Sequence, residues 1–176
     1  MRKMLAGASA ALLTCAVMAG AASAASPSSS KTTSGLDRAS LKTSMEGDLF
    51  EIAGGKLALH KTHSRAVANL GRRLIKDHTK SYRDTVKVAE QLGVPVETSP
   101  SPSEVWELKT LAKVSGTTFD RWYTSLEVYD HTQDIEETTD EIKDGSNAAV
   151  IADAKQDLPM LKMHLHLSES AYRAVK

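Results

Sequence analysis

Histidines at helical spacings are the residues of this sequence that most directly suggest a chemistry. In the stretch LIKDHTKSYRDTV, residues 74–86, His78 lies four residues after Leu74 and so shares its helical face. His131 and His164 lie on or at the edge of the apolar faces of two later segments. Imidazole and carboxylate groups together suit iron, manganese, zinc or copper ions. The spacing therefore raises the question of a metal site inside a helical core.

Glu51 is the carboxylate that best fits such a site. It shares a helical face with Gly55 and Ala58, so a neighbouring helix could approach closely enough for His78 to reach Glu51. Gly54 and Gly55 each cost a helix about 1 kcal/mol relative to alanine, and close backbone packing would explain that cost. We predict that Glu51 pairs with His78.

Two interpretations of these residues belong to different functional classes. In the first, the buried polar pairs are structural, because buried polar groups require hydrogen-bond partners. The chain is then a non-catalytic binding or interaction module with no cofactor. In the second, it is a metal-binding or metal-dependent redox protein. The candidate metal ligands of that second interpretation are Glu51, His78, His131 and His164. We take the first as the primary expectation.

No known catalytic motif is present in the sequence. Di-iron centres of helical bundles use a Glu-x-x-His pair on each of two helices. The residues three positions before the candidate histidines are instead apolar: Ile75, Val128 and Leu161. A serine nucleophile elbow, a glycine-rich phosphate loop and a zinc-protease histidine pair are also missing. Enzymatic activity is therefore not predicted.

Other polar residues near these positions are expected to be solvated. Asp77 points about 100° away from His78 around a helix and is expected to pair with Arg73 or Lys80. Three histidines are expected near or at the surface: His60, His63 and His166.

The first 24 residues have the features of a secretory signal peptide. A short basic start precedes an apolar run, and the small residues ASA, residues 22–24, form a cleavage signal. The protein is therefore expected to be exported, to the periplasm or outside the cell. Lipid anchoring at Cys15 is the alternative. Cys15 is the only cysteine, so cleavage after Ala24 would leave a chain without thiols.

The remaining composition indicates a single globular domain. Cleavage removes Arg2 and Lys3, which leaves 20 basic against 22 acidic residues and a net charge of about −2. This balance does not favour nucleic-acid binding, and no transmembrane segment is expected in the mature chain. A cell-envelope partner or a homo-oligomer fits this composition. The serine- and threonine-rich residues 25–40 are predicted to be a disordered linker, and residues 41–174 the domain.

Helix start and stop signals recur along the domain. The first helix is expected over residues 44–61, and Pro159 predicts a kink in the last helix or a new start capped by Asp157. Expected starts are Ser64, Ser101 with Pro102 and Glu104, Thr117 or Thr118, and Ser146 or Asn147; expected ends are Gly93, Gly116 and Gly145. Four long helices, with one short helix in the crossover between the second and third, predict an all-α four-helix bundle.

Four ordered stretches carry a resemblance to a known family. They are FEIAGGKLAL, RRLIKDHTKSY, FDRWY followed by YDH, and DLPMLKMHLHLSE. In order and spacing they resemble the bacterial exported family called domain of unknown function 4142, over residues 41–171. The resemblance implies a ferritin-like four-helix bundle, and it implies no established activity.

Overall fold

The computed structural model describes residues 32–176, which form five α-helices and contain no β-strand. The helices are α1 (Gly35–Lys61), α2 (Arg65–Leu92), α3 (Pro102–Leu111), α4 (Gly116–Asp144) and α5 (Ala148–Ala174). The prediction of an all-helical domain is therefore confirmed over this part of the chain. The predicted signal peptide, Cys15 and the first residues of the predicted linker lie outside the described residues.

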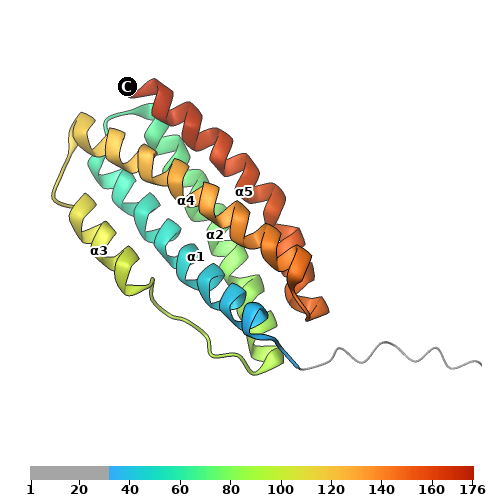
Figure 1. The fold of residues 1–176 in the computed structure, drawn as a ribbon. Helices are drawn as coiled ribbons and strands as arrows, with labels where there is room; N and C mark the ends of the chain where they lie inside the picture. Colours follow the sequence, from blue (N-terminus) through green and yellow to red (C-terminus); the bar gives the residue numbers. More distant parts are fainter. Residues whose placement is uncertain (1–31) are drawn as a thin grey trace, which may run out of the picture.

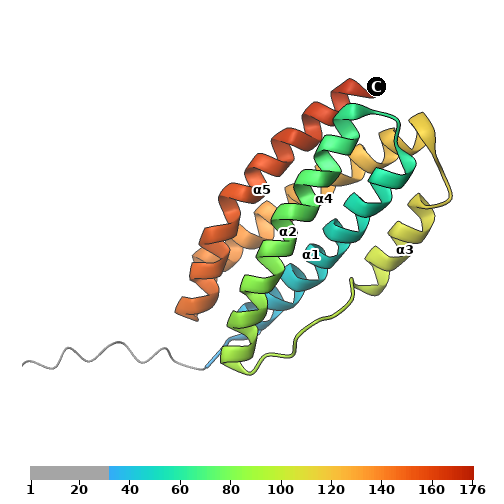
Figure 2. The same cartoon turned by 180° about the vertical axis from the view of Figure 1, so that it is seen from behind.

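Four long helices lie side by side, and α3 lies against their outer surface (Figures 1 and 2). α1 packs along α2 and α4 packs along α5, so the chain forms two helical hairpins. Further contacts of α2 with α5 and of α1 with α4 close the bundle. The segment that contains α3 runs along the outside from one end of the bundle to the other, and it connects α2 to α4 (Figure 1).

Most helix ends follow the local signals in the sequence. The Ser64 side chain accepts a hydrogen bond from the first turn of α2, and Gly93 ends that helix with φ of 70° in the left-handed region. Ser101 and Glu104 form the predicted capping box around Pro102. The Asn147 side chain caps α5, which continues through Pro159 without the alternative second start.

Three predicted boundaries are wrong. α3 ends at Leu111 and not at Gly116, which is the first residue of α4. α1 begins at Gly35 rather than Ser44, because Ser34 and Asp37 form a capping box at its start. Residues 35–40, predicted as linker, are therefore the first turns of a helix. α4 begins at Gly116, just after the cap position Ser115, and not at Thr117 or Thr118.

A close backbone contact sets the separation of α1 and α2. A Cβ atom added at Gly55 would lie 2.7 Å from the backbone oxygen of Gly71 and 2.8 Å from the Ile75 side chain. No larger residue fits at Gly55 without moving one of the helices. The predicted close approach at Gly55 is confirmed, one helical turn from Glu51.

The core is layered along the bundle axis. One end has an apolar cluster that includes Leu70, Leu74, Phe119 and Tyr123, and the other has a cluster that includes Leu41, Met45 and Val150. On α1, α2 and α5, buried polar residues lie between the positions that belong to these two clusters, and on α4 such residues follow the positions of the first cluster. We call six of them the polar layer: Asp48, Glu51, His78, Glu127, His131 and His164.

The surface of the bundle is mixed. None of the helices in residues 32–176 has both the length and the apolar composition needed to cross a bilayer. Trp106, Trp122 and Tyr129 are each more than half exposed, and they line a groove of about 440 Å³ between α3 and α4.

Candidate metal centre

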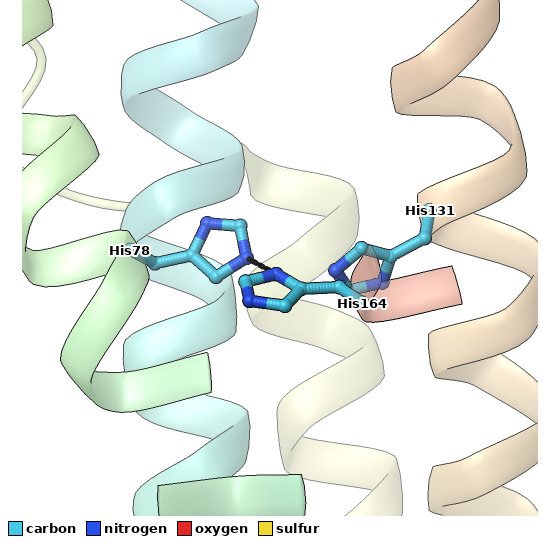
Figure 3. Close-up of side chains that lie close together, drawn as sticks. All are labelled: His78, His131 and His164. Carbon is cyan, nitrogen blue, oxygen red and sulfur yellow. Dashed lines mark hydrogen bonds between the residues drawn. The ribbon is translucent and has the colours of Figure 1, made fainter. Parts of the chain in front are cut away.

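Three helices bring three imidazole rings together in the polar layer. His78 comes from α2, His131 from α4 and His164 from α5, and the rings face one another (Figure 3). Their centroids are 5.0–5.6 Å apart, and one ring nitrogen of each lies within 4.8 Å of the others. All three side chains are at most 2% exposed. We call this group the three-histidine centre.

The closest pair of these nitrogens has the spacing of two ligands on one ion. His78 Nε2 and His164 Nδ1 are 3.2 Å apart (Figure 3). Two nitrogens bound at about 2.0–2.1 Å to a tetrahedral zinc ion are about 3.3–3.4 Å apart. The pair could therefore accept a metal ion with little movement.

The other nitrogen of each ring contacts an oxygen atom. His78 Nδ1 is 2.7 Å from an Asp48 carboxylate oxygen, and His164 Nε2 is 3.0 Å from an Asp77 carboxylate oxygen. His131 Nδ1 donates to the backbone carbonyl of Glu127 over 2.9 Å. Metal-binding histidines almost always have such a partner, because it fixes the tautomer and the ring orientation.

The protonation state of His131 follows from its partner. A backbone carbonyl can only accept a hydrogen bond, so Nδ1 carries the proton and Nε2 of the neutral ring carries a lone pair. Nε2 is buried and has no hydrogen-bond partner among the described residues. A lone pair oriented in this way is a ready metal ligand.

His164 is fixed in the same manner. Burial alone would raise the pKa of Asp77, but hydrogen bonds from His164 and Arg73 lower it, so Asp77 is ionised. His164 Nε2 therefore donates to Asp77, and its Nδ1 presents a lone pair to His78.

Two protonation states of Asp48 and His78 can account for the close contact between the His78 and His164 nitrogens. In one, a protonated Asp48 donates to His78 Nδ1, and His78 Nε2 donates to His164. In the other, His78 Nδ1 donates to ionised Asp48, and a cation lies between the two lone pairs. The first arrangement leaves His131 Nε2 unpaired, whereas a metal ion satisfies all three nitrogens at once.

Burial keeps these rings neutral, which is the form that binds metals. It lowers the pKa of His78 and of His164 to about 4. Burial, reinforced by the two neighbouring imidazoles, lowers the pKa of His131 to about 3. No proton has to be removed from a charged imidazolium before a metal ion binds near neutral pH.

Two glutamates lie beside His131. Carboxylate oxygens of Glu51 and of Glu127 are each 3.7 Å from His131 Nδ1. Burial raises the pKa of Glu51 well above its usual value, and the neighbouring Glu127 raises it further. Burial also raises the pKa of Glu127, to about 8. This pair is costly to ionise unless positive charge is brought near.

A small cavity reaches the centre from one side. It has a volume of about 50 Å³ and extends from buried His78 and Asp48 to exposed Glu137. Several other acids lie along it: Asp134, Asp153 and Asp157. A cavity lined with acids favours the entry of cations.

The structure separates the predicted residues into two groups. His78, His131 and His164 converge, as the metal interpretation required. The predicted pairing of Glu51 with His78 is wrong, because His78 contacts Asp48 and Glu51 lies beside His131. Glu51 lies about one turn further along α1 than Asp48 and on nearly the same face, so the position of α1 along α2 brings Asp48 to His78.

The candidate site predicted from the sequence did not include Asp48, Glu127 or the contact of Asp77 with His164. Asp48 lies three residues after buried Met45, and Glu127 lies between Tyr123 and His131 at spacings of four residues. Both spacings are on the buried faces, and this signal could have identified them. Asp77 does pair with Arg73 as predicted, and it also contacts His164. His60, His63 and His166 are exposed, as expected.

Comparisons with known proteins identify a family. The profile of the family described as Domain of unknown function (DUF4142) matches residues 22–170. The chain belongs to this family. Neither the curated proteins nor the solved structures yield a match. Membership of DUF4142 confirms the family resemblance, but its description names no activity, so the function must be argued from the site.

Proposed function

We propose that this DUF4142 protein binds a metal, and that its three-histidine centre holds one divalent transition-metal ion. The observation that carries the proposal is the arrangement of the six imidazole nitrogens. Three contact oxygen atoms of Asp48, Asp77 and Glu127. Of the other three, His78 Nε2 and His164 Nδ1 face each other, and His131 Nε2 is buried without a hydrogen-bond partner among the described residues. This is the pattern of ligand and supporting residue that metal-bound histidines have.

The donor set indicates the class of ion. Imidazole suits zinc, copper, iron and nickel, and affinities of such sites are generally highest for Cu²⁺ and Zn²⁺ among these divalent ions. Three protein ligands leave at least one coordination position for water or another small ligand. The cavity beside His78 lies on the side from which such a ligand would arrive.

A purely structural role for the histidines is the competing interpretation. It accounts for the contacts of His78 with Asp48 and of His164 with Asp77. It does not account for His131 Nε2, a buried nitrogen without a hydrogen bond from the described residues. An unpaired buried polar atom of this kind costs about 1–3 kcal/mol, which a bound ion would offset.

The proposal is tested by metal analysis of protein purified without a histidine tag. The protein is freed of metal with a chelator, exposed to excess Zn²⁺ and dialysed before elemental analysis. We expect one tightly bound ion per chain in the wild type and loss of that ion in His78→Ala, His131→Ala and His164→Ala. His166→Ala is the matched control, because His166 is exposed on the same helix as His164. Absence of bound Zn²⁺ from the wild type, or its retention in all three variants, would contradict the proposal.

The arrangement of the helices supports a ferritin-like superfamily assignment. Two helical hairpins joined by one long crossover are the connection pattern of ferritin-like bundles. The proposed centre nevertheless differs from a di-iron centre, since it has three histidines and none of the Glu-x-x-His pairs. An experimental structure with a bound ion would test both parts of this assignment.

We also propose that the protein acts outside the cytoplasm, on the basis of the signal-peptide features of residues 1–24. The mass and N-terminal sequence of the protein isolated from its native host test this proposal. A chain that begins at Ala25 is expected. A lipidated chain that begins at Cys15 would replace cleavage after Ala24, and a chain that retains residues 1–24 would contradict export by cleavage.

A further inference from the structure

The side of His131 that faces away from the other two imidazoles has ligand groups of its own. Glu51 from α1 and Glu127 from α4 place carboxylate oxygens 3.7 Å from His131 Nδ1. One ligand atom from each of the three residues lies within 4.8 Å of the others. We call Glu51 and Glu127 the carboxylate pair.

The carboxylate pair has no cationic side chain beside it in the described part of the chain. Both side chains are 1% exposed. Apart from a hydrogen bond between the two acids, the two Glu51 oxygens and Oε2 of Glu127 have no hydrogen-bond partner within residues 32–176. No lysine or arginine in the same range lies within 4.0 Å of either carboxylate; the nearest ionisable nitrogen paired with them is His131 Nδ1.

In the metal-free protein burial raises the pKa of both glutamates, and a hydrogen bond shared by the two neighbouring carboxyls raises the pKa of Glu51 further and opposes the rise at Glu127. One shared proton engages one oxygen of each carboxyl and leaves the other oxygens of this buried pair without a donor. A cation in place of that proton would satisfy both acids together.

We propose that Glu51, Glu127 and His131 form a second divalent-cation site, adjacent to the three-histidine centre and suited to Mn²⁺ or Fe²⁺. Two carboxylates and one imidazole match the ligand preference of these ions better than that of Cu²⁺. Ligands bound at about 2.1 Å with angles of about 110–120° are about 3.4–3.6 Å apart, and both separations from His131 Nδ1 are 3.7 Å, only slightly longer. The double positive charge balances the two carboxylates.

His131 is shared between the two sites. Its Nε2 belongs to the three-histidine centre, and its Nδ1 faces the carboxylate pair. For Nδ1 to serve as a ligand of the second ion, the proton that it donates to the Glu127 carbonyl would have to leave to water. The second site thus rests on the proposed function through His131 alone, since its carboxylate ligands are independent of His78 and His164.

Metal stoichiometry tests the second site with Mn²⁺ and Zn²⁺ as probes. The chelator-treated full chain is first given one equivalent of Zn²⁺, because sites of this kind generally bind Zn²⁺ more tightly than Mn²⁺. It is then dialysed against Mn²⁺ alone and analysed for both ions, and bound Mn²⁺ is also counted by electron paramagnetic resonance. We expect one Zn²⁺ and one Mn²⁺ per wild-type chain. Glu51→Gln/Glu127→Gln is expected to lose Mn²⁺ and to keep Zn²⁺. Should the double variant fail to fold, the two single variants replace it, and each is expected to weaken Mn²⁺ binding at least tenfold.

Glu141→Gln is the matched control. Glu141 is also buried on α4 with both carboxylate oxygens lacking a hydrogen bond from the described residues, but it belongs to neither ligand group. This variant is expected to keep both ions. Equal loss of Mn²⁺ in Glu141→Gln and in the carboxylate-pair variants would overturn the second site.

The remaining outcomes separate the two sites. A wild type that binds one ion, lost in His78→Ala but kept in Glu51→Gln/Glu127→Gln, overturns the second site and leaves the three-histidine centre standing. One ion lost only in the carboxylate-pair variant overturns the three-histidine centre and supports the carboxylate site. Two ions that both persist in the carboxylate-pair variant also overturn the second site.

Discussion

The ends of the bundle core are packed with apolar side chains, whereas its middle is packed with ionisable side chains. At one end, Phe119 stacks on Tyr123 with ring centroids 5.6 Å apart and a 12° angle between the planes. In the middle, on the same helix, Glu127 and His131 occupy the next two positions at spacings of four residues. All four side chains are at most 1% exposed. The helix therefore changes from apolar to ionisable packing within one turn.

The difference separates residues that stabilise the fold from residues that hold a ligand. Apolar side chains gain free energy simply by leaving water. Imidazoles and carboxylates lose favourable hydration free energy on burial, and only hydrogen bonds or bound ions offset that loss. Several oxygens and one nitrogen of the polar layer have no hydrogen-bond partner among the described residues. The apolar ends thus supply the stability that such a costly middle requires.

Truncation at an apolar end is expected to give the largest effect. Phe119→Ala should lower the free energy of unfolding by about 3–5 kcal/mol, because it leaves a cavity at a fully buried position. Urea unfolding followed by circular dichroism measures this change. Trp122→Ala is the control on the same helix, since Trp122 is 52% exposed and its loss should cost about 0.5 kcal/mol or less. If the two variants lost the same free energy of unfolding, the larger stabilising role given to the buried apolar end would be contradicted.

Metal loading is expected to stabilise the polar layer. Free Zn²⁺ at 100 times its Kd should raise the free energy of unfolding by about 2.7 kcal/mol, because the ion binds the folded chain and not the unfolded one. Thermal unfolding with and without chelator measures the shift. His164→Ala should show almost none of it. A shift of the same size in this variant would mean that the ion binds elsewhere.

An apolar substitution in the middle should act in the opposite direction to Phe119→Ala. In the metal-free protein, His131→Leu should raise the free energy of unfolding by about 1–3 kcal/mol, because it removes an unpaired buried nitrogen. Urea unfolding in the presence of chelator measures the gain, with His166→Leu as the exposed control. A marked loss of stability in His131→Leu would show that the imidazole is needed for packing itself.

The affinity for Zn²⁺ at the three-histidine centre should rise with pH. Burial raises the pKa of Asp48 well above its usual value, so this carboxyl is protonated in the metal-free protein at pH values below the raised pKa. In the metal-bound protein the ionised Asp48 carboxylate would accept a hydrogen bond from His78 Nδ1–H, and the proton displaced from His78 Nε2 would leave to water, so binding releases one proton. The affinity should then increase about tenfold, or 1.4 kcal/mol, per pH unit within that range.

Calorimetry in buffers of different ionisation enthalpy counts this proton. Zn²⁺ binding to the Glu51→Gln/Glu127→Gln variant isolates the three-histidine centre from the second site. Asp48→Asn should remove the proton release. A wild-type affinity that does not change between two pH values below the raised pKa would contradict the proposed protonation of Asp48.

Much of the secondary structure was predictable from the sequence. Ser64, Gly93, Ser101 and Asn147 mark helix ends because capping bonds join atoms only two to five residues apart. The missed start of α1 at Gly35 has the same local character, since Ser34 and Asp37 form a capping box. The histidines of the site were also predictable, because their spacing places them on apolar faces.

The partners of those histidines were decided by the tertiary structure. Whether His78 meets Asp48 or Glu51 depends on how α1 is rotated and shifted against α2, and the backbone contact at Gly55 and Gly71 limits both. Asp48 and Glu51 are one turn apart on the same helix, so helical spacing alone cannot choose between them. The sequence determined which side chains face inward, because that depends on local periodicity. Packing between helices determined which side chains meet, because that depends on contacts among residues far apart in the chain.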